Sequence, residues 1–515
     1  MATVLKSFAV DGVNAYPVQV EVMSLGGLPN TTIVGLGDTA VKEARQRIEA
    51  GIICSDARYP LNRLVINLAP GEMKKSGSHF DLAMALGVII ETKQLIPLSE
   101  NLSQAGFIGE LSLTGEIRSV RGVLPMVVTA KEMGLKRLYL PTSNLKEASL
   151  VSGIELLGFS HLKTLVEYLG GKSLYIPHVE KEETKAENSP ATVDFSEILG
   201  QDMLIEYIVA AAAGGHNMLM IGSPGCGKSM IAKRIPTILP PLTESEALEV
   251  TKIYSVAGLL KDQNLITERP FRSPHHNAST NSLIGGGNPV APGEISLAHN
   301  GVLFLDEIAE FEKKTLDALR QPMEDGRVTI SRVRSTHTFP CRFMLVAAMN
   351  PCPCGHYGQE KCRCTDYEVL KYRQKISGPI LDRIDLQKYV HPVDFLNLSS
   401  SKKGKSSAEL RERVQKAREI QLKRFRNLEN INANAQMNEA LIKEYCRLED
   451  GAKNLLRLAF DKLRFSARTY NKFLKLARTF ADLNEAKNIR AEDISAALMS
   501  RDLDKDRAGM LVTGE

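Results

Sequence analysis

Hydrophobic and polar positions follow three different patterns along the chain. In residues 1–172, segments with alternating apolar side chains are separated by segments whose apolar residues recur every three or four positions. Alternation is typical of half-buried strands, and the longer period is typical of amphipathic helices. Strands are therefore expected at 18–23, 64–68 and 137–140, and helices at 38–48, with Asp38 as N-cap, and at 80–90. The pattern predicts a mixed α/β domain.

Residues 193–398 contain short runs in which nearly every residue is apolar. The runs at 218–221, 302–305 and 343–349 fit buried strands. Helical patterns lie at 205–213 and from 230 onward. A second α/β domain is predicted here.

The last stretch, residues 399–515, is helical in its pattern. Helices are expected at 467–483 and 491–498, and an amphipathic helix is expected within 401–430. Lysine and arginine outnumber glutamate in 401–430, so this helix has a basic face that is either solvated or in contact with a phosphate backbone. Between the first two domains, residues 173–192 are strongly charged and include Ser-Pro, which predicts a flexible linker.

A glycine-rich segment directly after the run at 218–221 has the form G-x-x-x-x-G-K-S. Its residues are Gly222, Ser223, Pro224, Gly225, Cys226, Gly227, Lys228 and Ser229. Glycines let backbone N–H groups turn toward phosphates, and the helix that follows adds a partial positive charge. Lys228 is expected to contact the β- and γ-phosphates of ATP, and Ser229 is expected to bind Mg²⁺. The alternative is a glycine-rich turn without a ligand.

Polar side chains end the next two apolar runs. Asp306 and Glu307 follow the run at 302–305, where Asp306 can hold Mg²⁺ through water and Glu307 can activate the attacking water. Asn350 follows the run at 343–349 and is expected to position that water opposite Glu307. The alternative for Asn350 is a turn residue before Pro351. Together with the glycine-rich segment, these residues predict hydrolysis of a nucleotide triphosphate.

Four of the eight cysteines are clustered, as Cys352-Pro-Cys354 and Cys362-Arg-Cys364. Four thiolates at this spacing can surround one structural Zn²⁺, and reduced thiols without a metal are the alternative. The 515 residues include no apolar run near the roughly 20 residues that span a membrane and no signal peptide pattern, which predicts a cytoplasmic protein with reduced cysteines. A net charge of +5 is too small to indicate nucleic acid by itself.

Several longer motifs carry a resemblance to a known family. They are Arg272-Ser-Pro-His-His276, Glu307, Asn350-Pro-Cys-Pro-Cys-Gly355 and Ile376-Ser-Gly-Pro-Ile-Leu-Asp-Arg-Ile-Asp385. In this order the chain resembles the Mg-chelatase-like AAA+ ATPases of the YifB/ComM type over essentially its whole length. The resemblance implies a P-loop AAA+ core at 193–398. It also implies an N-terminal Lon-protease-like (S5 domain 2-like) α/β domain at 1–172 and a small helical C-terminal domain at 399–515.

The resemblance also implies roles for single residues. The family forms hexameric rings with ATP at the subunit interfaces, which makes Arg383 the arginine finger; an ion pair with Asp382 or Asp385 is the alternative. Arg468 matches the sensor-2 arginine that closes over the nucleotide, with Arg464 and Arg478 as nearby competitors.

Two further features of the AAA+ domain are a glycine-rich loop and a pair of histidines. The loop at 282–293, with its three consecutive glycines, is expected to be long and mobile, and the family places such inserts toward the ring pore. His275 and His276 are interpreted as structural or interface residues, with substrate contact or metal binding as the alternative.

Segments at 67–82 and 113–125 resemble those that carry the Ser–Lys dyad of Lon-type proteases. On that pattern the serine position falls at His79 and the lysine position at Leu124, so both partners are missing. Ser76 and Ser78 lie nearby and keep peptidase activity open as a weaker alternative. The domain is interpreted as a rigid accessory domain.

These expectations lead to two main functional hypotheses. The first is an ATP-driven motor that acts on single-stranded or branched DNA through its backbone, as in the branch-migration helicase role of ComM-like members in natural transformation, with recombination proteins as partners. The second is a chelatase-like or chaperone-type ATPase that remodels a protein without contacting DNA. A proteolytic AAA+ machine is a third hypothesis, which the missing dyad opposes.

Overall fold

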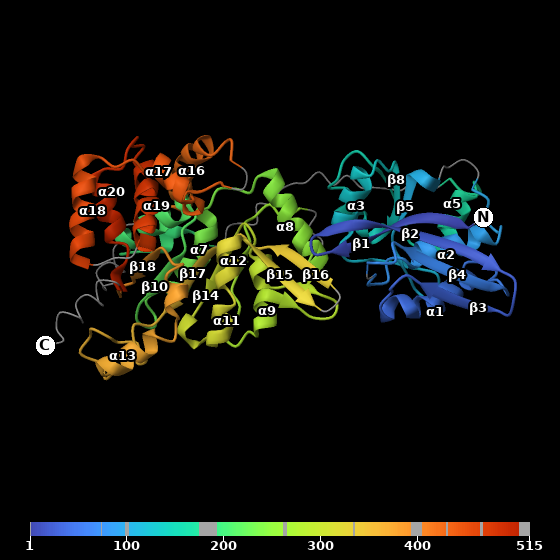
Figure 1. The fold of residues 1–515 in the computed structure, drawn as a ribbon, viewed down its shortest axis with the longest axis horizontal. Helices are drawn as coiled ribbons and strands as arrows, with labels where there is room; N and C mark the ends of the chain where they lie inside the picture. Colours follow the sequence, from blue (N-terminus) through green and yellow to red (C-terminus); the bar gives the residue numbers. More distant parts are fainter. Residues whose placement is uncertain are drawn as a thin grey trace.

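The computed structural model describes residues 2–73, 75–97, 102–174, 193–260, 265–332, 335–392, 404–428, 431–463 and 467–503. Three parts follow one another along the long axis of the molecule (Figure 1). An α/β domain contains the N-terminus, a second α/β domain lies in the middle, and a helical domain lies at the other end. Most of the predicted linker, residues 175–192, falls outside the described residues.

The N-terminal domain is built on a seven-stranded sheet with the order β3-β4-β2-β1-β5-β8-β9. The strands are β1 (Thr3–Asp11), β2 (Asn14–Leu25), β3 (Asn30–Val34), β4 (Arg63–Ala69), β5 (Ala105–Phe107), β8 (Arg137–Pro141) and β9 (Glu155–Phe159); β6 (Glu110–Leu111) and β7 (Ile117–Arg118) form a separate pair. β2 is antiparallel to both β1 and β4, and the other neighbours in the sheet are parallel. The predicted strands at 18–23, 64–68 and 137–140 are confirmed.

Helices cover this sheet and close its core. They are α1 (Thr39–Cys54), α2 (Asp81–Glu91), α3 (Val123–Glu132), α4 (Leu145–Ala148) and α5 (Leu162–Leu169). The side chain of Asp38 accepts a hydrogen bond from the backbone N–H of Val41, so the predicted N-cap of α1 is confirmed. Nine residues of α2 are buried, because this apolar helix packs against β1 and β2 inside the domain.

The middle domain contains a five-stranded parallel sheet with the order β11-β14-β17-β10-β18. Its strands are β10 (Met218–Ile221), β11 (Phe271–Arg272), β14 (Val302–Leu305), β17 (Met344–Met349) and β18 (Leu386–Tyr389). All residues of β10, β14 and β17 are buried. These are the three apolar runs of the sequence, and apolar residues at every position suit a strand that is covered on both faces.

Helices and two small hairpins surround the parallel sheet. The helices are α6 (Asp202–Gly214), α7 (Lys228–Ile238), α8 (Glu244–Ala257), α9 (Thr280–Ile284), α10 (Glu294–Leu297), α11 (Lys313–Asp317), α12 (Arg320–Asp325), α13 (Asp366–Arg373) and α14 (Gly378–Leu381). The hairpins pair β12 (Gly285–Gly286) with β13 (Ala291–Pro292) and β15 (Arg327–Arg332) with β16 (Ser335–Pro340). The loop predicted at 282–293 therefore contains part of α9 and a short strand pair, and its predicted mobility stays a prediction.

The C-terminal helices share a hydrophobic core with the middle domain. They are α16 (Ser407–Arg424), α17 (Glu439–Tyr445), α18 (Asp450–Leu463), α19 (Ala467–Leu483) and α20 (Ala491–Leu498). Leu410, Val414 and Ala417 of α16 are fully buried in a cluster that also contains residues of α6, α7 and β10. The predicted helices at 467–483 and 491–498 are confirmed. No helix in the described part of the chain has the length and apolar character that crossing a membrane requires.

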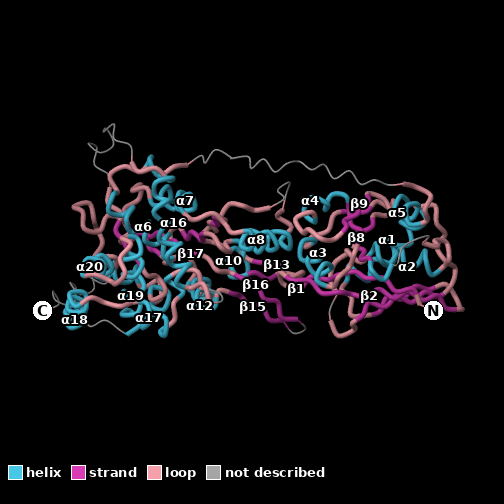
Figure 2. Tube along the Cα trace, turned by 90° about the horizontal axis from the view of Figure 1, so that it is seen from above, coloured by secondary structure: helices cyan, strands magenta, loops and turns pink. Residues whose placement is uncertain are grey.

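The N-terminal domain contacts the middle domain through α8 and the β15–β16 hairpin, the elements nearest to it in both views (Figures 1 and 2). His337 Nδ1 lies 2.7 Å from Asp11 Oδ1. The backbone N–H of Gly122 donates to the carbonyl of Ser255 at 3.2 Å, and the Ser255 hydroxyl donates to Glu147.

Candidate active site

The predicted catalytic segments meet at one edge of the parallel sheet. Gly222 follows β10, Asp306 follows β14, and Asn350 follows β17. These three strands are neighbours in the sheet, and the carboxyl ends of parallel strands point to the same edge. Segments that are far apart in the sequence are thereby brought together.

The glycine-rich segment forms a tight turn between β10 and α7. Gly225 and Gly227 have φ values of 80° and 90°, in the left-handed region that favours glycine. Lys228 is the first residue of α7, and its side chain turns back over the loop. Its Nζ donates to the carbonyls of Gly222 at 2.7 Å and Ser223 at 3.0 Å. The oxygen atoms of a bound phosphate could accept the same hydrogen bonds from Lys228 Nζ. Because they also carry negative charge, they would bind the ammonium group more strongly than the carbonyls do.

Two carboxylates lie next to the loop. The Ser229 hydroxyl donates to Asp306 Oδ2 at 2.6 Å, so the two oxygen ligands predicted for Mg²⁺ are in contact. Glu307 has a φ of 49°, an uncommon conformation for a residue with a side chain, and its N–H donates to Asp306 Oδ1 at 3.0 Å. This turn exposes the Glu307 side chain, of which 56% is accessible.

Asn350 links the loop to the space in front of Glu307. Lys228 Nζ donates to Asn350 Oδ1 at 3.3 Å, which opposes the alternative of a mere turn residue. Asn350 and Glu307 both line a cavity of about 660 Å³. Glu310, Pro353, Glu368, Lys371, Tyr372, Gln374 and Lys375 form the rest of its wall. The cavity is large enough for water and side chains beside a bound phosphate.

Arg383 and Arg468 form ion pairs with the same carboxylate, that of Glu324. Glu324 Oε1 of α12 accepts from Arg383 Nη2 at 2.7 Å and from Arg468 Nη2 at 2.6 Å. The predicted alternative partners of Arg383 were wrong: Asp385 instead lies 3.2 Å from His216 Nδ1, and the structure shows no ion pair between Arg383 and Asp382 within its described residues.

Of the two competitors for the sensor-2 role, Arg478 is buried and bound to Asp482, which leaves it no access to a nucleotide. Arg464 lies outside the described residues. Arg468 therefore lies with the arginine-finger candidate rather than on its own phosphate loop, and no described contact joins it to that loop.

The four clustered cysteines converge. Their sulfur atoms all lie within 4.8 Å of one another, and three of the separations are 3.4, 3.8 and 3.9 Å. Zinc–sulfur bonds of about 2.3 Å place the sulfurs of a tetrahedral site about 3.8 Å apart. Backbone N–H groups of Arg363 and His356 lower the pKa of Cys354 to about 6, while burial and the neighbouring cysteines raise the pKa values of Cys362 and Cys364. The arrangement fits a zinc ion.

The cysteine loop also contacts the phosphate loop. Gln359 Nε2 donates to the Ser223 hydroxyl at 3.2 Å. Gly355 lies so close to Pro224 that a Cβ at position 355 would be 2.6 Å from the proline Cδ. A metal held by this loop would therefore support the phosphate loop from outside.

The two positions that correspond to the Ser–Lys dyad of Lon-type proteases, His79 and Leu124, hold no catalytic pair. Leu124 is fully buried, and burial lowers the pKa of His79, itself almost inaccessible, to about 4. Of the two nearby serines, Ser78 donates its hydroxyl to Glu110. Within the described residues the structure shows no lysine bonded to a serine at this position, so the peptidase hypothesis gains no support.

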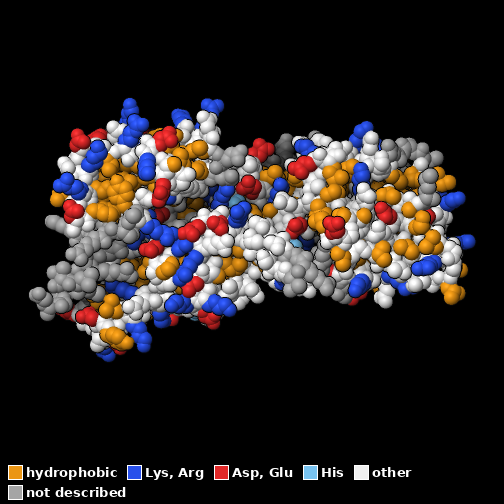
Figure 3. Space-filling view, in the orientation of Figure 1, with side chains coloured by type: hydrophobic (Ala, Val, Ile, Leu, Met, Phe, Trp, Pro, Cys, Tyr) orange, Lys and Arg blue, Asp and Glu red, His pale blue; other side chains and the backbone are white. Residues whose placement is uncertain are grey.

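Most of the basic side chains of α16, and Lys405 just before it, are bound within the protein. Arg411 donates to the Thr237 carbonyl, Arg413 and Lys405 to Glu206, Arg418 to the Ala212 and Asn432 carbonyls, Arg424 to Asp482, and Lys416 pairs with Glu412. On the face shown in Figure 3, basic and acidic side chains are interspersed over the helical domain. Lys402 and Lys403 lie outside the described residues. The predicted basic face therefore consists of intramolecular contacts and of exposed side chains, namely Arg411, Lys416, Lys423 and Arg426, which agrees with a solvated face; contact with a phosphate backbone stays a prediction.

Two contacts at the site were not predicted. Glu324 has no motif around it, and its position between two arginines depends on the packing of the C-terminal domain. His276 belongs to a motif that the sequence displays, but its partner Glu307, at 3.7 Å, is set by the order of the strands.

The phosphate loop, the Ser229–Asp306 contact and the amide at the end of the next strand define a P-loop ATPase. Residues 194–398 match the family model described as magnesium chelatase, subunit ChlI, and residues 20–144 and 404–501 match the models for subunit ChlI of Mg-chelatase and for its C-terminal part. The chain is 41% identical to YifB of Salmonella typhimurium over 96% of both chains.

Two further relatives are equally extensive. YifB of Escherichia coli is 40% identical over 98% of this chain and 97% of its own. The competence protein ComM of Haemophilus influenzae is 40% identical over 96% of both chains. The chain belongs to the Mg-chelatase ChlI-like family of AAA ATPases, to which YifB and ComM belong.

Proposed function

We propose that this protein is an ATP-hydrolysing ring motor that acts on DNA, with branch migration as its activity. The observation that carries the proposal is the similarity to a competence protein over 96% of both chains, combined with an ATPase site whose parts lie together. The Lon-like domain is proposed to be an accessory domain, because its dyad positions are occupied by a buried histidine and a leucine.

Each residue of the site has a proposed role in hydrolysis. The backbone of the phosphate loop and Lys228 bind the phosphates of ATP, and Ser229 and Asp306 would hold Mg²⁺, which neutralises phosphate charge when bound. Glu307 accepts the proton of the attacking water, and Asn350 orients that water from the neighbouring strand.

Arg383 and Arg468 are proposed to serve the neighbouring subunit. The guanidinium groups of Arg383 and Arg468 both pair with Glu324 and therefore lie side by side. If this surface faces the γ-phosphate of a neighbouring subunit, both arginines lie near that phosphate. Positive charge at that point stabilises the transition state of phosphoryl transfer. This proposal requires a ring, which we expect to be a hexamer.

Contacts to DNA are proposed to use the β15–β16 hairpin rather than α16. Thr329, Ser331, Thr336 and Thr338 are exposed on this hairpin, and hydroxyl groups donate readily to phosphate oxygens. Such contacts are sequence-independent, and any basic side chains that join them make binding salt-dependent.

The four-cysteine loop is proposed to hold one structural zinc ion.

The decisive experiment is the ATPase rate with single-stranded, duplex and branched DNA in a salt series. Stimulation that is largest with branched DNA and fades with salt is the expected result. A rate that no DNA changes at any salt concentration would contradict the motor proposal and favour the remodelling of a protein partner. A Lys228→Ala variant controls for contaminating ATPases, because it should hydrolyse no ATP with any DNA.

A further inference from the structure

The β15–β16 hairpin stands apart from the parallel sheet of the middle domain. Among the described residues its two strands pair with each other, from Arg327 opposite Pro340 to Arg332 opposite Ser335, and form a separate two-stranded sheet. A two-stranded hairpin is at best marginally stable in water, so it needs support from the protein around it. The proposed contacts to DNA depend on such support, because they are assigned to this hairpin.

Side chains of the hairpin alternate between two faces. Four hydroxyl side chains share the exposed face: Thr329, Ser331, Thr336 and Thr338. On the other face, Val328 and Phe339 lie opposite each other and are buried in a hydrophobic cluster of the middle domain. Ile330 and His337 follow them on this inner face, because alternate residues of a strand point to the same side. The hairpin is therefore supported from its inner face, and its hydroxyl groups stay accessible.

The turn between β1 and β2 of the N-terminal domain lies against this hairpin (Figures 1 and 2). The Asp11 carboxylate accepts a hydrogen bond from His337 Nδ1 at 2.7 Å. Gly12 comes so close to the hairpin backbone that a Cβ at this position would lie 2.5 Å from the carbonyl oxygen of Thr338. Val13 packs against the hydrophobic cluster that also contains the inner face of the hairpin. Three successive residues of one turn thus contact the hairpin or the core beneath it.

The N-terminal domain is attached to the middle domain at a second place, on α8. The backbone N–H of Gly122 donates to the carbonyl of Ser255 at 3.2 Å, and the Ser255 hydroxyl donates to Glu147. The same carboxylate accepts from the backbone N–H of Leu124 at 2.9 Å. Leu248 of α8 packs against a hydrophobic cluster of the N-terminal domain. Because the domain is fixed at α8, its β1–β2 turn is held in place against the hairpin.

The position of α8 relates this attachment to the ATP site. The helix α7 begins at Lys228, and a short segment, residues 239–243, joins it to α8. The N-terminal domain therefore connects the helix that follows the ATP-binding helix with the hairpin that is proposed to contact DNA. A domain in this position can affect how the two parts move relative to each other.

We propose that the N-terminal domain is a brace that holds the hairpin in the position needed for DNA to stimulate ATP hydrolysis. The β1–β2 turn supports the hairpin, and α8 anchors the domain. This role does not need the missing Ser–Lys dyad. It rests on the proposed function, because the hairpin is the proposed DNA contact. The described contacts of the turn do not include the phosphate loop or Glu307, so loss of the brace should weaken the response to DNA and leave hydrolysis without DNA unaltered.

The first test measures amide hydrogen exchange of β15 and β16 without DNA, in the unaltered full-length protein, in Asp11→Ala, in His337→Ala and in the double variant. Each single substitution should speed exchange of the hairpin amides by roughly 3- to 10-fold, the effect of one lost hydrogen bond. The double variant should exchange no faster than the faster single variant, because both substitutions remove the same contact. Asp56→Ala is the matched control, since Asp56 pairs with Lys163 outside this contact, and it should change nothing in the hairpin.

The second test measures the concentration of branched DNA that gives half-maximal stimulation of ATP hydrolysis by the same variants. Asp11→Ala and His337→Ala should each need roughly 3- to 10-fold more DNA. Without DNA, kcat and KM for ATP should stay within about twofold of the unaltered values. Asp56→Ala should respond to DNA as the unaltered protein does.

Unaltered hairpin exchange in Asp11→Ala would overturn the proposal. Faster exchange with an unaltered response to DNA would overturn it as well, because the brace would then not serve that response. A weaker response in His337→Ala alone would indicate that His337 contacts DNA directly, which also contradicts a brace. If DNA does not stimulate the unaltered protein, the proposed function is wrong, and the exchange measurement still decides whether the N-terminal domain supports the hairpin.

Discussion

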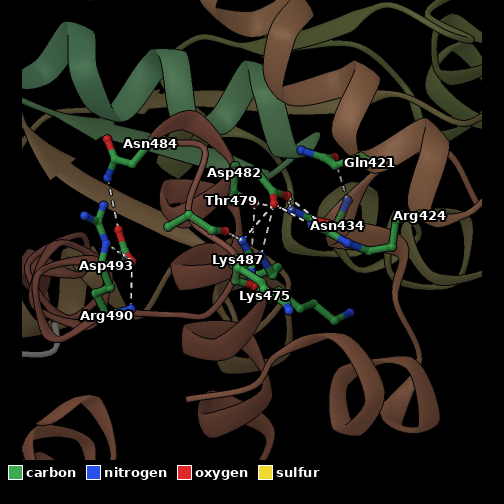
Figure 4. Close-up of polar contacts among 12 residues, drawn as sticks. Gln421, Arg424, Asn434, Lys475, Thr479, Asp482, Asn484, Lys487, Arg490 and Asp493 are labelled. Carbon is green, nitrogen blue, oxygen red and sulfur yellow. Dashed lines mark hydrogen bonds and ion pairs between the residues drawn. The ribbon is translucent and has the colours of Figure 1, made fainter. Parts of the chain in front are cut away.

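Replacing Arg424 by glutamine separates two roles that the basic helix α16 can have. Arg424 Nη1 and Nη2 donate to Asp482 Oδ2 and Oδ1 at 2.8 and 2.5 Å, and Nη1 also donates to Asn434 Oδ1 at 2.9 Å (Figure 4). The Asp482 side chain is 0% exposed and that of Arg424 is 12% exposed. This is a buried ion pair between α16 and α19, so we expect Arg424 to stabilise the fold and not to bind DNA.

The expected loss of folding free energy depends on the contacts that Asp482 retains after Arg424 is replaced. Removing one partner of a buried ion pair costs about 3–5 kcal/mol, because the other charge stays in a poorly solvated place. Asp482 retains Arg478 and the Asn434 amide, so we expect the lower value, about 3 kcal/mol. The C-terminal helices share a core with the middle domain, so the two unfold as one larger unit, for which 1 kcal/mol shifts Tm by about 2–4 °C. The Tm of this unit should therefore fall by roughly 6–12 °C.

Calorimetry of the full-length protein measures the stability, and DNA affinity in a salt series measures the phosphate contacts. Arg424→Gln should lower the melting transition and leave the salt dependence unchanged at a temperature where the protein is folded. Lys416→Gln is the matched control on the same helix, since its pair with Glu412 is exposed, and it should change neither quantity. An unchanged transition with a salt slope reduced by about one would refute the reasoning.

Three other predictions concern the site and its support. Lys228→Ala should weaken ATP binding by roughly 10- to 100-fold in a titration, because a charge-assisted contact to phosphate is lost; unaltered affinity would exclude the phosphate-loop assignment. Purified protein should contain about one zinc per chain, and Cys352→Ser should remove the metal and lower both Tm and the ATPase rate; metal-free protein with full activity would contradict this. Burial opposes the charge of Asp385, but His216 and Lys472 hold its pKa at about 2, below its ordinary value. Its ionised form therefore stabilises the fold at neutral pH, and this contribution should disappear as the pH falls from about 4 to 2, with Asp385→Asn showing a flatter pH dependence of Tm.

Much of the site could be located from the sequence because its signals are local. Gly222, Asp306 and Asn350 each follow an apolar run directly, and a buried strand is the structure such a run predicts best. The cysteine cluster is also local, since its two pairs lie on one loop. The roles of these residues in hydrolysis remain predictions, but their meeting at one sheet edge follows from strand order.

Partners that depend on packing between distant segments could not be predicted. Arg424 and Asp482 are 58 positions apart, and Arg468 and Glu324 are 144 apart. Each charge, seen alone, looks like a solvated surface residue. Arg424 and Asp482 become buried only when the helices are assembled, whereas Arg468 and Glu324 meet at the surface. This is why the sequence predicts a basic face on α16, although four of its arginines bind other parts of the C-terminal and middle domains.

We propose that ATP binding is linked to hydrolysis through the contact between Lys228 and Asn350. The lysine ammonium is satisfied by two loop carbonyls and the Asn350 oxygen at 3.3 Å. Phosphate oxygens carry more negative charge than any of these acceptors, so they compete most effectively for the weakest of the three oxygen contacts, which is the one to Asn350. On this proposal Asn350 is released toward the cavity that it shares with Glu307. Its amide would then bind water only when a phosphate occupies Lys228, which would tie hydrolysis to a filled site.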